Sequence, residues 1–335
     1  MIRAEGSTPR EAGAHMAVRP DGSVLETVGG GCGEHEVVRA ARGSMASGRA
    51  AIVRLDLAGP ADSGASPVCG GTMEVLVEPL RTVSDREWLP ALVRLREQGR
   101  TVFLVRELVE SGPVESRVLT VADADGTVVW GGTEASVLSE SLRGSGPSVR
   151  FIERTKSRGR LLLETIPPVD RMIIVGGGHI GKALAVIASL LRFEVTILDE
   201  REEFADRERF PFATEVRHGD PGVILETVPG GETGYFVLVS HGYPTDVRAL
   251  RTLLRKPTRY IGMIGSRRRV EMVRRALSKD GLEREFADRV YGPIGLAIGS
   301  ETPEEIAVSI AAEIVAVRNG LGRSAGSLSA TRVPG

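Results

Sequence analysis

The chain has two cysteines, Cys32 and Cys69, and each lies in a glycine-rich segment. Glycine leaves a neighbouring thiol sterically open, and a helix predicted to begin at about Glu34 would place Cys32 at its N-terminal end. The helix field there lowers the pKa of a thiol and favours the reactive thiolate. Such a thiol can carry sulfur, attack an electrophile or bind a soft metal. We therefore predict catalytic roles for both cysteines and a metal-binding role for Cys32, with a small apolar packing residue as the alternative for each.

Cysteine usage and charge exclude several classes of protein. Two cysteines form no disulfide framework, and no C-x-x-C or H-x-x-x-H pair completes a four-ligand zinc site. The formal net charge of −1 gives no overall attraction to nucleic acid or to an anionic membrane. No apolar run reaches the roughly 20 residues of a membrane span, and the polar N-terminus is not a secretory signal. We expect a cytoplasmic protein that binds neither nucleic acid nor membrane.

A glycine-rich loop in the second half predicts a nucleotide-binding site. The segment GGGHIG, residues 176–181, matches the G-x-G-x-x-G fingerprint, follows the apolar run Met172–Val175 and precedes a predicted helix, Lys182–Leu191. In this fingerprint the first glycine makes a tight turn, the second lets a pyrophosphate approach and the third allows close helix packing. The alternative is a glycine turn that binds no nucleotide, and a structural role is favoured for the side chain inside the loop, His179. The cofactor-binding residues predicted here are Gly176, Gly178, His179 and Gly181.

Polar residues at the ends of other predicted strands converge on the same edge, because ligands of open α/β sheets bind at the carboxyl ends of the strands. Asp199 lies 18 residues after the glycine loop, where an acidic residue binds ribose hydroxyls. His241 is predicted to be a catalytic acid–base group or a ligand contact, with a hydrogen-bonded structural histidine as the alternative. Ser266 and Arg267 form a second predicted phosphate site, unless the arginine run is a solvated helix face. Gly295 completes the predicted cofactor-binding set.

The elements that position these residues follow from the apolar pattern. The C-terminal half alternates apolar strands with helices, which indicates a parallel sheet covered on both faces. The last helix is capped by Thr302, has Pro303 and Glu305 in its first turn, and carries an apolar face. That face and the sheet edge raise the expectation of a homodimer. We predict a Rossmann-like doubly wound sheet with strands at Met172–Val175, Val195–Leu198, Thr214–Arg217, Tyr235–Val239, Tyr260–Ile264 and Val290–Ile294.

The N-terminal half is predicted to be a mixed α/β domain. A turn at Pro20-Asp21-Gly22 joins two short strands, and a helix follows the first cysteine. The run Ser84–Glu87 is predicted to be a capping box that opens a helix ending at Gly99. The remaining strands are predicted at Ala51–Leu57, Met73–Val77, Thr101–Arg106, Arg117–Val121 and Thr127–Trp130.

Breaks in composition divide the chain. Residues 143–147 are rich in Gly, Ser and Pro, and Pro167-Pro168 stiffens the approach to the first strand of the second half. We therefore predict an N-terminal domain over 1–146, a linker over 147–170, a nucleotide-binding domain over 171–321 and a loose tail over 322–335.

Taken together, these motifs resemble the XdhC/CoxI family of molybdoenzyme maturation factors. The resemblance spans nearly the whole chain, and its segments stand in the order of the family. In the first half they are GSTPREAGAHM (6–16), GSVLETVGGGCGE (22–34) and CGGTMEVLVEP (69–79). In the second half they are IIVGGGHIGKAL (173–184), IGMIGSRRR (261–269) and GPIGLAIGSETPEEIAVSIAAEIVA (292–316).

The resemblance implies an accessory factor rather than a turnover enzyme. Members of the family look like chaperones that transiently bind the molybdenum cofactor, a molybdopterin carrying molybdenum. They assist replacement of an oxo by a sulfido ligand and hand the cofactor to an apo molybdenum hydroxylase of the xanthine or carbon monoxide dehydrogenase type. The implied partners are that apoenzyme and a cysteine desulfurase.

Two other functions remain open from the residues alone. An NAD(P)-dependent oxidoreductase would explain the glycine fingerprint and Asp199, but no Tyr-x-x-x-Lys motif accompanies them. A regulatory protein that senses NAD(P) or another nucleotide would also use such a loop, but it leaves the cysteine motifs unexplained.

Overall fold

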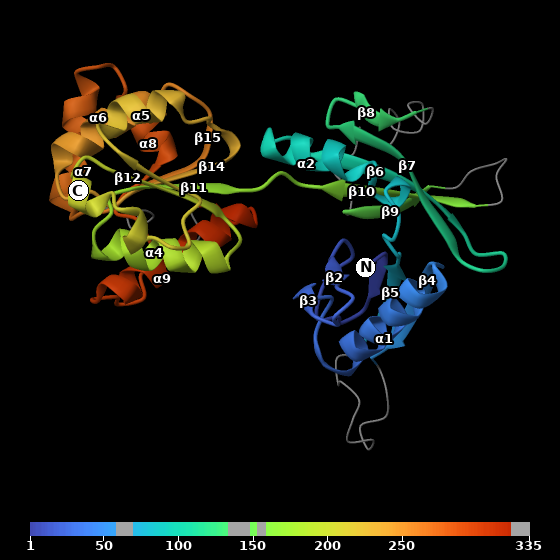
Figure 1. Ribbon diagram of the computed structural model, residues 1–335. Coiled ribbons are helices and arrows are strands. Elements are labelled where there is room, and N and C mark those ends of the chain that lie inside the picture. Colours follow the sequence, from blue (N-terminus) through green and yellow to red (C-terminus); the bar gives the residue numbers. More distant parts are fainter. Residues whose placement is uncertain (58–69, 133–147, 153–158, 323–335) are drawn as a thin grey trace. The chain divides into compact units, whose positions relative to one another are not determined.

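The computed structural model describes residues 1–57, 70–132, 148–152 and 159–322. The chain divides into two compact units, Met1–Pro168 (unit 1) and Val169–Gly335 (unit 2) (Figure 1). Within the described ranges, no helix is long and apolar enough to cross a membrane.

Unit 2 contains a six-stranded sheet in which all neighbouring strands are parallel. The strand order is β13-β12-β11-β14-β15-β16, so the first strand lies in the middle, as is typical of Rossmann folds. The predicted Rossmann-like parallel sheet is therefore confirmed. The strands are β11 Arg171–Val175, β12 Glu194–Asp199, β13 Glu215–His218, β14 Gly231–Leu238, β15 Thr258–Met263 and β16 Val290–Tyr291.

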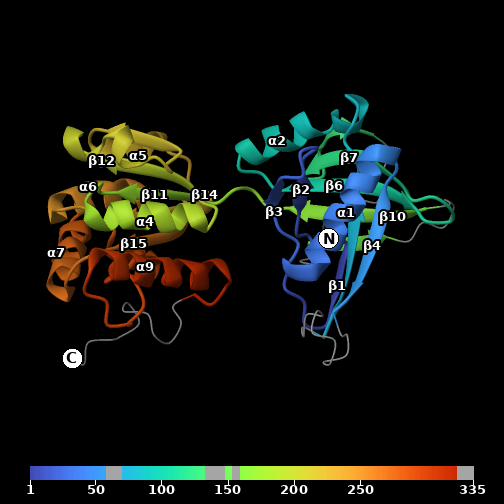
Figure 2. The ribbon, with the colours of Figure 1, turned by 60° about the horizontal axis from the view of Figure 1, so that its bottom comes forward.

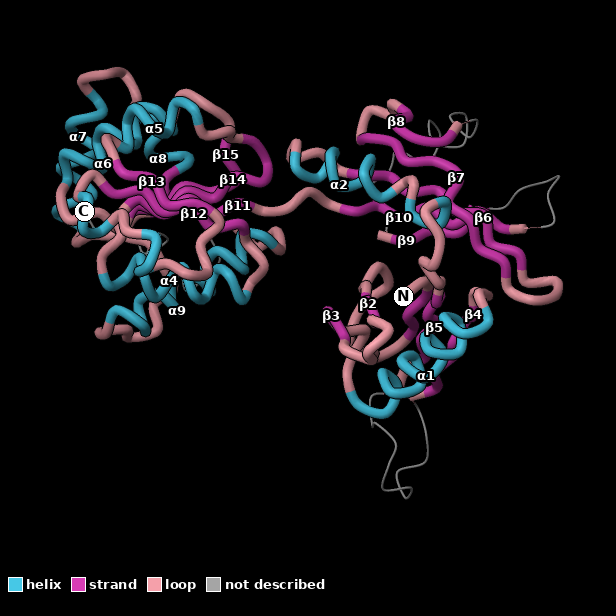
Figure 3. Tube along the Cα trace, viewed as in Figure 1, coloured by secondary structure: helices cyan, strands magenta, loops and turns pink. Residues whose placement is uncertain are grey.

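Helices cover both faces of this sheet (Figures 1 and 3). Alternate residues of β11 point to opposite faces, so Ile174 packs with Leu184 of one helical layer while Ile173 packs with Leu250 of the other. Burial on both faces explains the apolar runs of β11, β12 and β14, while the edge strand β13 has no fully buried residue. One layer contains α4 His179–Leu190 and α9 Pro303–Arg318, and the other contains α5 Pro221–Thr227, α6 Tyr243–Leu253, α7 Arg267–Ser278 and α8 Glu283–Arg289.

The last helix, α9, has the predicted start. Thr302 and Glu305 form the capping box, with Pro303 in the first turn. Ile310 and Ile314 of α9 are buried, because α9 packs against α4 and the sheet (Figure 2). The apolar face that raised the expectation of a homodimer is thus used inside unit 2.

Unit 1 is built on two antiparallel sheets. The larger has the order β8-β7-β6-β10-β9, and α2, Leu89–Glu97, packs on it. The smaller has the order β1-β5-β4, and α1, Gly31–Ser47, covers it (Figure 2). A hairpin of β2 and β3 lies beside α1. The strands are β1 Arg3–Glu5, β2 Met16–Val18, β3 Val24–Glu26, β4 Ala51–Asp56, β5 Thr72–Val77, β6 Val102–Val109, β7 Glu115–Asp123, β8 Val128–Gly131, β9 Val149–Ile152 and β10 Arg160–Ile166.

The structure differs from the predicted linker over 147–170. Two strands, β9 and β10, lie in this range, and β10 pairs with β6 along all of its 7 residues. The proline pair directly follows β10 and ends it, because proline donates no ladder hydrogen bond. The two units therefore meet at Pro168, and of the predicted tail only Gly322 lies within the described residues.

The predicted capping box at Ser84 is wrong. Ser84–Arg86 form a short 3₁₀ turn without a side-chain cap, and α2 begins only at Leu89. The reciprocal bonds lie two residues earlier. The Thr82 hydroxyl accepts from the Asp85 N–H at 3.3 Å, and the Asp85 carboxylate accepts from the Thr82 N–H at 2.7 Å. The Asp85 carboxylate thus has the role that was predicted for Glu87.

Candidate functional site

The glycine loop after β11 is shaped by its own chain at three positions. A Cβ built at Gly176 would lie 2.5 Å from the Val239 carbonyl oxygen, and one at Gly177 would lie 2.1 Å from that of Phe204. At Gly181 the clash would be with the Gly176 carbonyl, at 1.9 Å. At Gly178, in contrast, a Cβ would meet no atom within 4 Å. Gly178 is therefore the one of these four glycines whose Cβ position is open.

The start of α4 leaves backbone donors beside that open face. Gly178 is the N-cap of the helix and supplies no capping side chain. The first N–H groups of a helix have no partner within the helix, and together with the helix field they attract an anion. His179, the first helical residue, is exposed, and the fold does not bury its ring.

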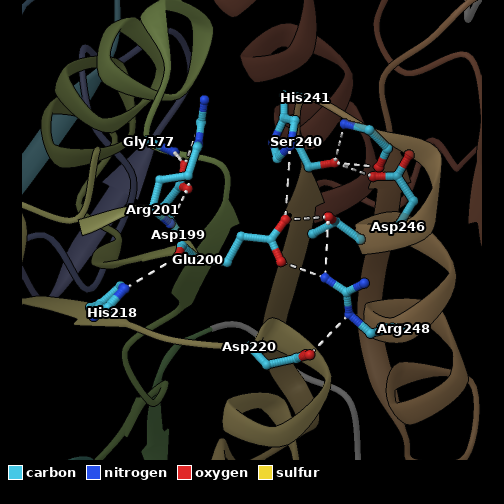
Figure 4. A network of polar contacts seen from close by, with 12 residues as sticks. Gly177, Asp199, Glu200, Arg201, His218, Asp220, Ser240, His241, Asp246 and Arg248 are labelled. Atoms are coloured by element: carbon cyan, nitrogen blue, oxygen red, sulfur yellow. Dashed lines mark hydrogen bonds and ion pairs between the residues drawn. The ribbon is translucent and has the colours of Figure 1, made fainter. Parts of the chain in front are cut away.

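Asp199 lies at the end of β12, reaches the glycine loop and is only 3% exposed. Its carboxylate accepts a hydrogen bond from the Gly177 N–H at 2.8 Å and a bidentate pair from Arg201 at 2.9 and 2.8 Å (Figure 4). Burial raises the pKa of Asp199, but the bonds from Arg201 and Gly177 outweigh it and hold the pKa below its ordinary value. The Arg201 guanidinium lies 3.7 Å from the centre of the Phe204 ring. It donates to both oxygens of the Asp199 carboxylate, which is the group that would accept hydrogen bonds from ribose hydroxyls.

A second carboxylate at this edge, Glu200, was missed by the sequence analysis. It accepts from the Thr245 hydroxyl at 2.7 Å and from Arg248, which also approaches Asp220 at 3.0 Å. His241, 53% exposed, points its Nε2 at Glu200 from 3.9 Å (Figure 4). That distance allows an ion pair but not a hydrogen bond. The predicted acid–base residue is therefore placed beside a carboxylate at the carboxyl edge of the sheet.

A buried ion pair ties two loops of this edge together. Asp246 of α6 is fully buried and accepts from the Ser240 hydroxyl at 2.7 Å and from Arg269 at 2.6 Å. Arg269 also donates to the Ser240 carbonyl at 3.1 Å. Burial raises the pKa of Asp246, and the bonds from Ser240 and Arg269 oppose that rise. The start of α7 is thereby fixed to the end of β14.

The predicted second phosphate site lies at that start. Ser266 is the N-cap of α7, and its hydroxyl accepts from the Arg269 N–H at 3.3 Å. Ser266 and Arg267 are both exposed. An exposed arginine at a capped helix start is a suitable partner for a phosphate.

Helix packing explains why a glycine stands at position 295. It is buried with φ of +104°, and a Cβ there would lie 2.4 Å from the Ser309 hydroxyl of α9. Its N–H donates to the Glu313 carboxylate at 3.2 Å. The structure accounts for this glycine by helix packing, and its predicted contact with a cofactor stays a prediction.

The first cysteine motif forms the start of α1. The helix begins at Gly31, three residues before the predicted start, so Cys32 lies in its first turn. Gly30 and Gly31 have φ of 70° and 67°, a conformation that favours glycine. The Glu34 carboxylate accepts from the Gly30 N–H at 3.1 Å, which fixes the turn into the helix.

The second cysteine, Cys69, lies outside the described residues, but the glycines after it are described. A Cβ at Gly71 would lie 2.6 Å from the Ser7 carbonyl oxygen, and one at Gly29 would lie 2.5 Å from Cγ of Pro9. Both glycine-rich segments thus pack against one loop, residues 7–9. Among the described residues, no group of three or more His, Cys, Asp or Glu could hold a metal ion.

Two family models match the chain. Residues 172–314 match the XdhC Rossmann domain, and residues 1–56 match the XdhC and CoxI family. The first match contains the glycine loop and the polar edge, and the second contains Cys32 and the loop against which both glycine-rich segments pack.

Curated relatives align with 95% of this chain at low identity. YqeB of Escherichia coli K12 is 24% identical over 320 residues, and the chain spans 43% of the length of that relative. A probable xanthine dehydrogenase subunit of Bacillus subtilis 168 is 26% identical, with 92% of its length covered. The molybdenum cofactor insertion chaperone PaoD of Escherichia coli K12 is 23% identical, with 82% of its length covered.

A solved structure shares the fold. The crystal structure of a xanthine dehydrogenase from Bacillus halodurans matches with a TM-score of 0.77 and 26% identity. The match covers 98% of this chain and 93% of that one.

Proposed function

The chain belongs to the XdhC and CoxI family, and from this premise we propose that it is a chaperone of the molybdenum cofactor. It binds the cofactor transiently, assists replacement of an oxo by a sulfido ligand, and inserts the cofactor into an apo molybdenum hydroxylase of the xanthine or carbon monoxide dehydrogenase type. The observation that carries the proposal is the open face of Gly178 at the start of α4, in a chain related to an insertion chaperone.

The residues of unit 2 fit a cofactor that bears phosphate. Gly178 leaves both space and backbone N–H groups at the start of α4, and Arg267 lies exposed at the start of α7. Each helix start stabilises an anion without a buried counter-charge. We assign the phosphate groups of the cofactor to these two helix starts. When bound, the cofactor supplies a molybdenum centre with exchangeable ligands.

Cys32 is the residue that we assign to sulfur or to molybdenum. It lies in the first turn of α1, and the thiolate is the form of cysteine that binds soft metals and carries sulfur. A cysteine desulfurase is the proposed donor of the sulfur. Cys69 is the proposed second thiol. Gly71, two residues after it, packs against the same loop, residues 7–9, as Gly29 does.

Transfer to an apoenzyme tests this proposal. The chain is loaded by co-expression with molybdopterin biosynthesis, purified, and added to an apo molybdenum hydroxylase. We expect hydroxylase activity to rise in proportion to the loaded chain, and not to rise with the unloaded chain. If a severalfold excess of loaded chain restores no activity, insertion is not its function.

A nicotinamide-dependent oxidoreductase is the second candidate. The sheet order and the contact of Asp199 with the glycine loop are those of dinucleotide-binding domains. Against it, Arg201 occupies both carboxylate oxygens. Micromolar binding of NAD(P)H together with hydride transfer to a carbonyl substrate would favour this candidate, and tight nucleotide binding without turnover would favour a sensor.

A further inference from the structure

Unit 1 contains a cavity of about 1050 Å³, which we call the tryptophan cavity. Residues of unit 1 line it, from the loop between α1 and β4, the segment between β5 and α2, the hairpin of β6 and β7, and the end of β8. Its size is that of a site for a small molecule or cofactor. Neither the glycine loop nor the cysteine motifs line it, so the functions discussed above do not account for it.

Both tryptophans of the chain, Trp88 and Trp130, line this cavity. Trp88 is buried, and its ring is held in place by a hydrogen bond from Nε1 to the Asp85 carbonyl at 2.9 Å. The Arg106 guanidinium lies 5.4 Å from the centre of the same ring. A fixed indole beside a guanidinium plane favours a flat ring as a ligand, because such a ring gains stacking area without ordering a flexible side chain.

The polar group of the cavity is the Arg106–Glu78 ion pair. The Arg106 side chain is only 9% exposed and pairs with Glu78, whose other oxygen accepts from the Ser116 hydroxyl at 2.5 Å. A guanidinium carries five donors in a planar fork, and Glu78 takes one Arg106 nitrogen. The Arg106 fork can therefore also bind a carbonyl oxygen on the edge of a flat ligand.

The charge of the lining decides between ligand classes. Five carboxylates face three guanidinium groups around the cavity, which disfavours a phosphate or another polyanion. The same surplus of acceptors favours a neutral ring that carries N–H donors. The charged residues are Glu78, Asp85, Glu87, Glu107 and Glu115 against Arg49, Arg106 and Arg117.

We propose that the tryptophan cavity binds a planar heterocycle with an amide-like edge, and specifically a pterin. A pterin offers N–H donors to the carboxylates, a carbonyl oxygen to Arg106 and a flat face to the indoles. A nucleobase shares this chemistry, and the choice of a pterin over a nucleobase rests on the proposed function. The inference that unit 1 binds a flat ring rests on the cavity alone.

Binding of phosphate-free rings to the full chain tests the inference. Titration calorimetry with 6-hydroxymethylpterin is expected to show one site, and Trp emission is expected to change with the same dissociation constant, since both indoles line the cavity. Guanosine and cytidine are the nucleobase probes. Binding of these nucleosides without binding of the pterin would overturn the assignment to a pterin, and binding of none of them at millimolar concentration would overturn the site.

Variants locate the ring and separate this test from that of the proposed function. Trp130 is half-buried, so Trp130→Leu is expected to fold and to weaken pterin binding at least tenfold, while Trp130→Phe keeps a ring and loses less than threefold. Arg268→Met changes an exposed side chain of unit 2 and is the control that leaves pterin binding unchanged. Equal weakening by the Leu and Phe variants, or loss in Arg268→Met, contradicts the inference. A chain that binds the pterin yet activates no apoenzyme would refute the chaperone function and leave this site in place.

Discussion

Gly177 and Gly178 are neighbours in one loop, yet a side chain would meet different surroundings at each. A Cβ at Gly177 would strike the Phe204 carbonyl, whereas one at Gly178 would face open space with φ of −71°. We therefore expect Gly177→Val to destabilise unit 2 and Gly178→Val to change its stability by less than about 1 kcal/mol. Gly178→Val should nevertheless lower retention of the molybdenum cofactor at least tenfold, because the new side chain fills the approach to the α4 N–H groups.

Thermal unfolding and the pterin content of the purified variants check this prediction. Gly43→Val is the matched control, because Gly43 is exposed on α1 and a Cβ there would also meet no atom within 4 Å. Normal cofactor content in Gly178→Val would remove the glycine loop from the binding site.

Glu164 predicts a pH dependence confined to unit 1. Burial raises the pKa of Glu164, but the hydrogen bond from His15 at 2.5 Å and the charge of Arg106 outweigh it, so the pKa lies below its ordinary 4.5. A depressed carboxyl pKa stabilises the fold above pH 4.5, and this contribution is lost as the pH falls through the folded-state pKa. We expect Glu164→Gln to cost about 2 kcal/mol at pH 7 and less as the pH falls towards 4.

Urea unfolding followed by Trp emission measures this effect, because Trp88 and Trp130 both belong to unit 1 and are the only tryptophans. The free energy of unfolding of the parent chain should fall with acid more steeply than that of the variant. Parallel pH curves would show that Glu164 is not the titrating group.

At the scale of elements, Asp246 and Arg269 join α6 to the start of α7. Removing one partner of a buried ion pair leaves an uncompensated charge, which costs about 3–5 kcal/mol. We expect Arg269→Met to lower the stability of unit 2 by an amount at the low end of this range, since the Arg269 side chain is 22% exposed. It should also weaken cofactor retention, because the Ser266 cap loses its anchor. Arg268→Met is the control: Arg268 is exposed, and its removal should change stability by less than about 0.5 kcal/mol.

Elements with a strong apolar period could be predicted, and elements held by partners distant in the sequence could not. In unit 2, β11, β12, β14 and β15 contain apolar runs, so their positions and parallel pairing followed from the sequence, whereas β16 ends at Tyr291, before the predicted end at Ile294. β10 was assigned to a linker because it lies between the Gly/Ser/Pro-rich residues 143–147 and Pro167-Pro168, which both suggested a connecting segment. Its partner, β6, lies more than fifty residues earlier in the sequence, and no local sequence pattern predicts that pairing.

In the candidate site, too, residues with local spacing could be predicted and residues with distant partners could not. The glycine loop and Asp199 were found because their spacing is fixed by a single strand–turn–helix unit. Glu200 was not found, because its hydrogen-bond partner Thr245 lies 45 residues away and only the sheet brings the two together. Its one local signal was its position directly after Asp199, at the carboxyl end of a strand.

At the scale of the whole molecule, the two units carry separate spectroscopic reporters. Both tryptophans lie in unit 1 and all four tyrosines lie in unit 2. A ligand that binds only folded unit 2 should raise the unfolding midpoint seen by tyrosine circular dichroism and leave the Trp emission midpoint unchanged. Inorganic pyrophosphate, which carries the phosphates without the ring or the molybdenum, is expected to act in this way, while a phosphate-free pterin should shift the Trp midpoint alone. Equal shifts of both midpoints by either ligand would contradict independent binding to the two units.

We propose that this chain holds the molybdenum cofactor through the thiol of Cys32. The most direct measurement is the pterin and molybdenum content of the chain purified after co-expression with molybdopterin biosynthesis, beside Cys32→Ser. We predict near-stoichiometric pterin and molybdenum in the parent chain, with molybdenum falling at least fivefold in the variant while its thermal midpoint is unchanged. Absence of both from the parent chain, together with tight binding of NAD or ATP, would contradict the account.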